Sequence, residues 1–129
     1  MKVRAIVARP GEKAVVEEIV PGYESLEQIV GGELDFCTPI MNDVVVICDK
    51  KGKQSGKMPN RFYFGDLSQA FIQDGQEVDV FAGTIVILGL RDGTEKLAGL
   101  TESEIDLFMD IYGKPQFQTD WELGGDGNE

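Results

Sequence analysis

The segment 78–90, VDVFAGTIVILGL, places the strongest constraint on how this chain can fold. Its centre, residues 85–88, is an unbroken run of isoleucine, valine and leucine, without the polar alternation of a strand that has one wet face. Such a run is typical of a strand covered on both faces. Gly83 before the run and Gly89 after it are residues expected where a strand bends or turns. We therefore predict a central, buried strand here.

Other segments predict the strands around it. The apolar run VVVIC at residues 44–48 predicts a second inner strand, lying beside the first. Residues 1–8 alternate apolar and basic side chains, which indicates a half-buried strand. Residues 14–20 predict a strand paired with it as a hairpin, and two adjacent glutamates suit this strand to a sheet edge. Residues 33–37 predict a further extended piece.

Two helices are expected. Residues 25–28, SLEQ, fit a capping box with Ser25 as the N-cap of a short helix that ends at the glycine pair 31–32. Residues 101–104, TESE, fit a second capping box, before a longer helix that runs to about Tyr112. The order of elements predicts an α+β fold: a single mixed or antiparallel sheet of about five strands, a short helix and a longer C-terminal helix.

The length of 129 residues suits one domain, which we place at residues 1–122, followed by a flexible acidic tail at residues 123–129. No apolar stretch approaches the roughly 20 residues that span a bilayer, so no membrane contact is expected. The chain has two cysteines and no signal-peptide pattern, which favours a reduced, cytoplasmic protein. The oligomeric state is left open.

Charge is distributed unevenly along the chain. The net charge is −11, which disfavours direct binding to nucleic acid. Residues 101–129 contain eight acidic residues and one basic residue. Residues 50–61 show the reverse, with five basic residues and no acidic one. This basic segment is where an anion would be tolerated best.

Catalytic and metal-binding signatures are lacking in the sequence. The chain has no histidine, which excludes His-based triads and His metal ligands. Cys37 and Cys48 are interpreted as buried small hydrophobic residues, so no metal site and no cofactor are predicted. An enzyme that uses carboxylates on a small substrate is kept as an alternative, and it requires a pocket that holds Glu33 or Asp35 beside Arg61.

The basic segment leads into the aromatic residues FYF at 62–64, and two interpretations are open. In the first, an anion or the edge of a nucleotide is bound by Lys57, Asn60, Arg61 and Tyr63. In the second, which we favour, Phe62 and Phe64 belong to the core while Asn60 and Arg61 hold a turn.

The predicted C-terminal helix carries Glu102, Asp106 and Asp110 in a line at four-residue spacing. This acidic face is usually an ordinary solvated surface. It could instead imitate the charge of DNA and occupy a DNA-binding protein, such as a restriction enzyme or another nuclease.

Several short motifs, in order along the chain, resemble a domain-of-unknown-function family encoded in Firmicutes genomes, phages and conjugative elements. They are the opening hairpin, SLE at 25–27 with GG at 31–32, the strand at 44–48 with PNR at 59–61, AGT at 82–84, and LT at 100–101 before the last helix. The resemblance reaches about Tyr112. It implies an accessory or host-interaction role and transfers no catalytic residue.

We therefore expect a non-enzymatic binding or regulatory domain of a bacterial mobile element or phage, acting on a protein partner.

Overall fold

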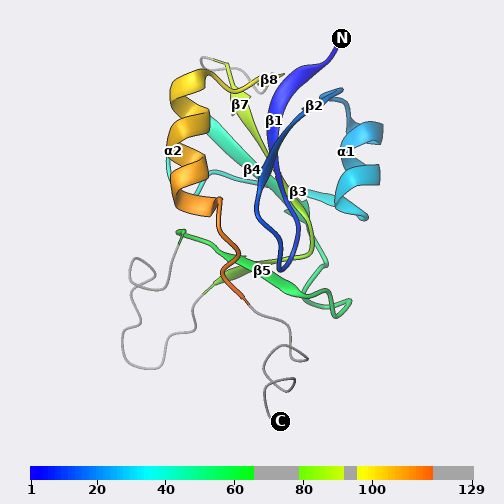
Figure 1. Ribbon diagram of the computed structural model, residues 1–129. Helices are drawn as coiled ribbons and strands as arrows, with labels where there is room; N and C mark the ends of the chain where they lie inside the picture. Colours follow the sequence, from blue (N-terminus) through cyan, green and yellow to red (C-terminus); the bar gives the residue numbers. More distant parts are fainter. Residues whose placement is uncertain (66–78, 92–95, 118–129) are drawn as a thin grey trace.

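The computed structural model describes residues 1–65, 79–91 and 96–117 (Figure 1). In order, the elements are β1 (Val3–Ala8), β2 (Val15–Ile19), α1 (Tyr23–Val30), β3 (Leu34–Cys37), β4 (Val44–Asp49), β5 (Pro59–Phe62), β6 (Val80–Ala82), β7 (Ile85–Leu90), β8 (Leu97–Ala98) and α2 (Glu102–Tyr112). The predicted tail at residues 123–129, and the domain boundary before it, lie outside the described residues.

One antiparallel sheet forms the centre of the molecule. Its strand order is β2-β1-β7-β4-β3, and β8 pairs with β7. The segment 85–90 is thus the central strand, and Val46 of β4 lies opposite Ile87. The α+β prediction, the neighbouring inner strands and the edge position of β2 are all confirmed. The sheet is antiparallel throughout, because every pairing of its strands is antiparallel.

The two helices cover opposite faces of this sheet, with α1 on one side and α2 on the other (Figure 1). Alternate residues of β4 and β7 therefore enter two separate cores. The core on the α1 side includes Val45, Ile47, Val86 and Leu88, while the core on the α2 side includes Val44, Val46, Ile85 and Ile87. This double coverage explains why neither strand alternates in polarity.

The predicted start of α1 was wrong. The helix begins at Tyr23 with Gly22 as its N-cap, and no side chain caps it. The extended backbone of Gly22 lets its carbonyl accept the Leu26 N–H, so the helix is nucleated before Ser25. The capping box of α2 is confirmed, because the Thr101 hydroxyl accepts the Glu104 N–H while the Glu104 carboxylate accepts the Thr101 N–H.

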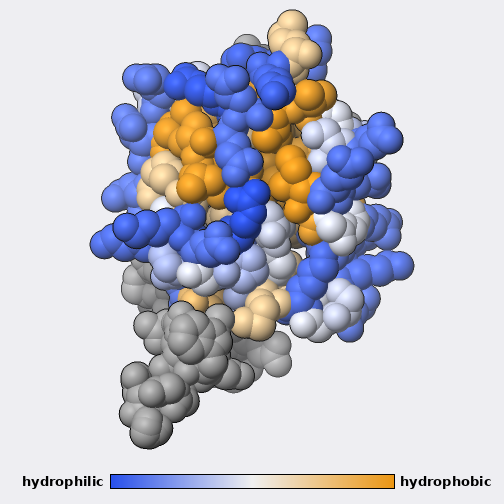
Figure 2. Space-filling view, turned by 45° about the vertical axis from the view of Figure 1, so that its right-hand side comes forward, coloured by the Kyte–Doolittle hydropathy of each residue, from blue (hydrophilic) through white to orange (hydrophobic). Residues whose placement is uncertain are grey.

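The edge strand β2 is largely exposed. Val15 and Val16 keep 42% and 44% of their surface accessible, and Glu17 and Glu18 follow them directly. Figure 2 shows apolar side chains reaching the surface, bordered by hydrophilic ones. The charged residues on β2 oppose strand-to-strand association at this edge.

A second, two-stranded sheet of β5 and β6 lies below the main sheet (Figure 1). It is antiparallel, with an irregular register between Pro59 and Arg61. The chain that leaves α2 is fastened to it, because Gln116 accepts the Phe62 N–H at 2.7 Å and donates to the Gly65 carbonyl. Among the described residues, neither helix has the length and apolarity needed to cross a membrane.

Candidate functional site

A cavity of about 250 Å³ opens between the β3–β4 edge of the main sheet and β6. Its wall is mixed, with carboxylates, lysines and two thiols around an aromatic floor. The lining residues are Asp35, Cys37, Cys48, Asp49, Lys50, Lys53, Gln54, Tyr63, Asp79, Val80, Phe81 and Ala82. We call this cavity the cleft.

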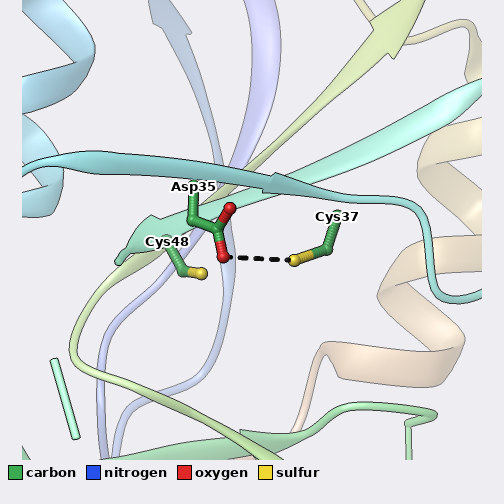
Figure 3. Close-up of side chains that lie close together, drawn as sticks. All are labelled: Asp35, Cys37 and Cys48. Carbon is green, nitrogen blue, oxygen red and sulfur yellow. Dashed lines mark hydrogen bonds between the residues drawn. The ribbon is translucent and has the colours of Figure 1, made fainter. Parts of the chain in front are cut away.

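Asp35, Cys37 and Cys48 bring three metal-ligand atoms together in the cleft wall (Figure 3). The register explains this, because Asp35 lies directly opposite Cys48, and Cys37 follows Asp35 by two residues on the same face of β3. The Cys37 Sγ lies 4.0 Å from Asp35 Oδ2. All three donor atoms lie within 4.8 Å of one another.

Cys37 and Cys48 are free cysteines, and their pKa values are shifted in opposite directions. A hydrogen bond from the Cys48 thiol lowers the pKa of Cys37, although burial and the Asp35 charge oppose this shift. The same hydrogen bond, with burial, raises the pKa of Cys48. The interaction between the two thiols therefore shifts their pKa values in opposite directions, down for Cys37 and up for Cys48.

The floor of the cleft is built from stacked rings. Tyr63 stacks on Phe81 with ring centroids 5.3 Å apart, and the Tyr112 hydroxyl donates to the Tyr63 carbonyl at 2.6 Å. At the rim, Lys53 Nζ pairs with Asp79 Oδ1 at 2.5 Å. The floor is thus anchored to the end of α2, while the rim is held by an ion pair between two loops.

Arg61 is fully buried and acts as a structural hub. Its Nε donates to the Tyr112 carbonyl at 2.8 Å, and its Nη2 donates to the Glu12 carbonyl at 2.7 Å. Its Nη1 donates to Asn60 Oδ1 at 2.6 Å. One guanidinium therefore joins β5, the β1–β2 turn and the C-terminal end of α2, whose last carbonyls lack partners within the helix.

Asn60 and Lys57 are likewise engaged in holding the fold. Asn60 Nδ2 donates to the carbonyls of Ala8 and Gly83 at 2.8 Å each. Lys57 Nζ donates to the carbonyls of Val30 and Gly31 at 3.1 Å and 2.9 Å, which caps the C-terminal end of α1. Lys57 also forms an ion pair with Asp49 at 2.6 Å.

The four residues of the predicted anion site are therefore not gathered in one pocket. Tyr63 lines the cleft, whereas Lys57, Asn60 and Arg61 are absent from its wall. An anion at Arg61 would have to displace carbonyl oxygens that already accept its N–H groups. The anion-binding role stays a prediction. The favoured alternative was right that Asn60 and Arg61 hold the fold, but both lie in strand β5 and not in a turn, and Phe64, expected in the core, is 42% exposed.

The other predicted residues lie elsewhere. Glu102, Asp106 and Asp110 are all exposed on α2, as the helical spacing predicted, and Glu102 lies 3.7 Å from Arg4. The alternative enzyme site required a pocket with Glu33 or Asp35 beside Arg61. The cleft holds Asp35, but Glu33 and Arg61 are absent from its wall. Glu33 pairs with Lys50 and Lys51, and the buried Arg61 donates to the last carbonyl of α2.

The sequence analysis interpreted both thiols as core residues, which is confirmed for Cys48, whereas Cys37 is only partly buried against the same core. It missed their grouping with Asp35. A usable signal existed in the hairpin formed by residues 33–49. If Asp35 is placed opposite Cys48, both thiols fall on one face together with a carboxylate. That step needs the strand register, which the irregular connection at 38–43 does not specify.

Comparisons with known proteins give a family and no activity. A family described as a domain of unknown function (DUF3846) matches residues 1–113, which include every described strand and helix. No curated protein matches the chain. No solved structure matches it either.

Proposed function

Since this chain belongs to the DUF3846 family of domains of unknown function, which assigns it no reaction, we propose that it is a non-enzymatic binding or regulatory domain and that the cleft is its ligand site. The observation that supports this most is the cleft itself, where Asp35, Tyr63 and Asp79 meet around a cavity of about 250 Å³. A few well-placed polar groups over an aromatic floor are characteristic of ligand sites.

The setting we propose is the bacterial cytoplasm, with the domain carried by a mobile element or phage and acting on a protein partner. The support is the resemblance of five short motifs, together with free thiols of the kind common in reducing compartments. Recurrent location of the genes of close relatives beside mobility or phage genes is the expected finding. Location among housekeeping operons would contradict this setting.

The cleft is tested by closing its mouth. Gln54 is exposed at the cleft wall, so Gln54→Trp is expected to block entry without disturbing the core, whereas Gln28→Trp on α1 serves as the matched control. NMR titration with amino acids, dicarboxylates and nucleoside monophosphates is expected to shift the amides of Tyr63 and Val80 in the wild-type protein. Gln54→Trp should weaken that binding at least tenfold. Shifts confined to other surfaces, or no shifts with any compound, would refute the cleft as a ligand site.

DNA mimicry is a second candidate, favoured by the exposed carboxylates of α2. Glu102, Asp106 and Asp110 repeat every four residues, so their positions rise about 6 Å per step along one exposed side of α2. They form a regular row of negative charges, as the phosphates of one DNA strand do with one charge per roughly 3.4 Å of the duplex axis.

A restriction-protection assay tests this candidate. The protein is expected to protect DNA from a restriction enzyme of its host. The triple variant Glu102→Gln, Asp106→Asn, Asp110→Asn should lose at least tenfold in protection. Glu24→Gln with Glu27→Gln on α1 removes exposed charge elsewhere and should protect normally. Absence of protection by the wild-type protein, or equal protection by the triple variant, would exclude mimicry through this face.

A further inference from the structure

The geometry of the cleft points to a binding site for a thiophilic divalent cation, Zn²⁺ in particular, held by Cys37 Sγ, Cys48 Sγ and an Asp35 carboxylate oxygen. This inference rests on the proposed function, because it names the ligand class of the same cleft. The three donors come from two adjacent strands of the rigid sheet and face the cavity together (Figure 3). A site built on paired strands positions its ligands more precisely than one built on loops.

The separations of the donors suit a tetrahedral ion. Two sulfur atoms that each lie about 2.3 Å from zinc are roughly 3.8 Å apart in tetrahedral geometry. The donor atoms of the three side chains lie within 4.8 Å of one another, and the pair formed by Cys37 and Asp35 is at 4.0 Å. Binding therefore requires movements of about 1 Å, which side-chain rotation supplies without a change in the strands.

The donor types select the ion. Two sulfur ligands favour Zn²⁺ and other thiophilic ions over Mg²⁺ and Ca²⁺, which require oxygen ligands. Three ligands from these residues leave the fourth tetrahedral position facing the cavity, the arrangement of zinc sites that bind an additional ligand. Two thiolates and a carboxylate around Zn²⁺ leave a net charge of −1, and the remaining charges of the cleft wall, Lys50 and Lys53 against Asp49 and Asp79, balance one another.

A disulfide is the main competing explanation for the two thiols, and the register disfavours it. Cys37 pairs with Val46 and Cys48 pairs with Asp35, so the two cysteines are diagonal neighbours. Diagonal positions are about 7–8 Å apart, whereas disulfides need Cα atoms within about 4.4–6.8 Å. A bound ion spans two sulfurs on diagonal positions more readily than a direct bond does, because each metal–sulfur bond adds to the reach.

The test is a titration of the reduced full-length protein with Co²⁺, followed by its absorption spectrum and by competition with Zn²⁺. We expect one Co²⁺ per chain, with a thiolate-to-metal charge-transfer band, ligand-field bands of a tetrahedral ion, and displacement by Zn²⁺. Cys37→Ser and Cys48→Ala should each weaken binding at least tenfold and halve the charge-transfer band. Asp35→Asn should weaken binding at least tenfold while it keeps that band. Asp110→Asn, with the same loss of charge on an exposed helix face, should bind normally.

Alkylation of the wild-type protein supplies an independent measurement, because it does not require that any variant folds correctly. Zn²⁺ is expected to slow the modification of both thiols by iodoacetamide in the wild-type protein at least tenfold, and Mg²⁺ should have no effect. The inference is overturned if no charge-transfer band forms, if neither cysteine variant changes it, or if the unfolded chain in guanidinium binds Co²⁺ equally well. NMR titrations that still map small molecules to the cleft of the metal-free protein would then leave the proposed function standing while the metal site falls.

Discussion

Arg61→Met is expected to lower the free energy of unfolding by about 3–5 kcal/mol, because it removes the donor shared by several acceptors of a buried hydrogen-bond network. The side chain is fully buried, and it satisfies the carbonyls of Tyr112 and Glu12 as well as Asn60 Oδ1. Methionine fills much of the volume but donates no hydrogen bond. Two buried acceptors, the Tyr112 carbonyl and Asn60 Oδ1, and the part-buried Glu12 carbonyl would therefore lose their donor at once. Each buried acceptor left unsatisfied costs about 1–3 kcal/mol.

Chemical denaturation measures this effect, and Arg9→Met provides the control. The Arg9 guanidinium pairs with Glu17 at 3.0 Å, but both side chains are more than a third exposed, so this change should cost less than about 1 kcal/mol. Arg61→Lys keeps the charge but lacks the planar fork, and should recover less than half of the loss. An Arg61→Met protein within 1 kcal/mol of wild type would show that these acceptors find water or other partners.

The second large effect is expected at Asp49, whose side chain is 5% exposed. Asp49→Ala should lower the free energy of unfolding by about 2–4 kcal/mol, because a partly buried ammonium group then loses its counter-charge. Burial by itself would raise the pKa of Asp49, but hydrogen bonds from Lys57 and from the Lys51 N–H outweigh it and lower that pKa. The carboxylate is thus stabilised in its charged form by the folded structure.

This ion pair joins the end of β4 to the loop before β5, next to the C-terminal end of α1. Lys57 holds the carbonyls of Val30 and Gly31 while it pairs with Asp49. A Cβ atom at Gly32 would lie 2.5 Å from Asp49 Oδ2, so the carboxylate also occupies space that only glycine leaves open. Loss of Asp49 should therefore loosen the C-terminal end of α1 as well.

A double-mutant cycle with Lys57→Met isolates the pair, with the protein kept metal-free by a chelator. We expect a coupling energy of about 1.5–3 kcal/mol between Asp49 and Lys57, the range of charge-assisted hydrogen bonds that are shielded from solvent. Glu33→Ala is the control, since Glu33 meets Lys50 and Lys51 only at 4.0 Å and 3.8 Å and is 56% exposed; its cost should be below about 1 kcal/mol. Additive effects of Asp49 and Lys57 would show that the two side chains stabilise the fold independently.

Local sequence patterns were sufficient to predict the strands and helices of the fold, but they did not predict which buried polar groups contact one another. The run at residues 85–88 and its partner at 44–48 are apolar at every position, and only a strand covered on both faces accommodates such a run. The capping box at residues 101–104 could likewise be recognised from the sequence, because its two hydrogen bonds join residues only three positions apart. The start of α1 was misplaced because a glycine with no side-chain signal served as its N-cap.

The candidate site depended on contacts between residues far apart in the chain. The sequence left Arg61 either as an anion binder or, in the favoured interpretation, as a residue that holds a local turn. It instead joins distant segments, because its partners Glu12 and Tyr112 are about 50 residues away on either side. Cys37 and Cys48 were interpreted as core residues, and Cys48 does belong to the core; the register of β3 on β4 is what groups both thiols with Asp35 in the wall of the cleft. Periodicity specifies which face of an element is buried, because that depends on neighbours along the chain; which polar atoms meet depends on strand register and on the packing of distant segments, and only the tertiary structure decides those.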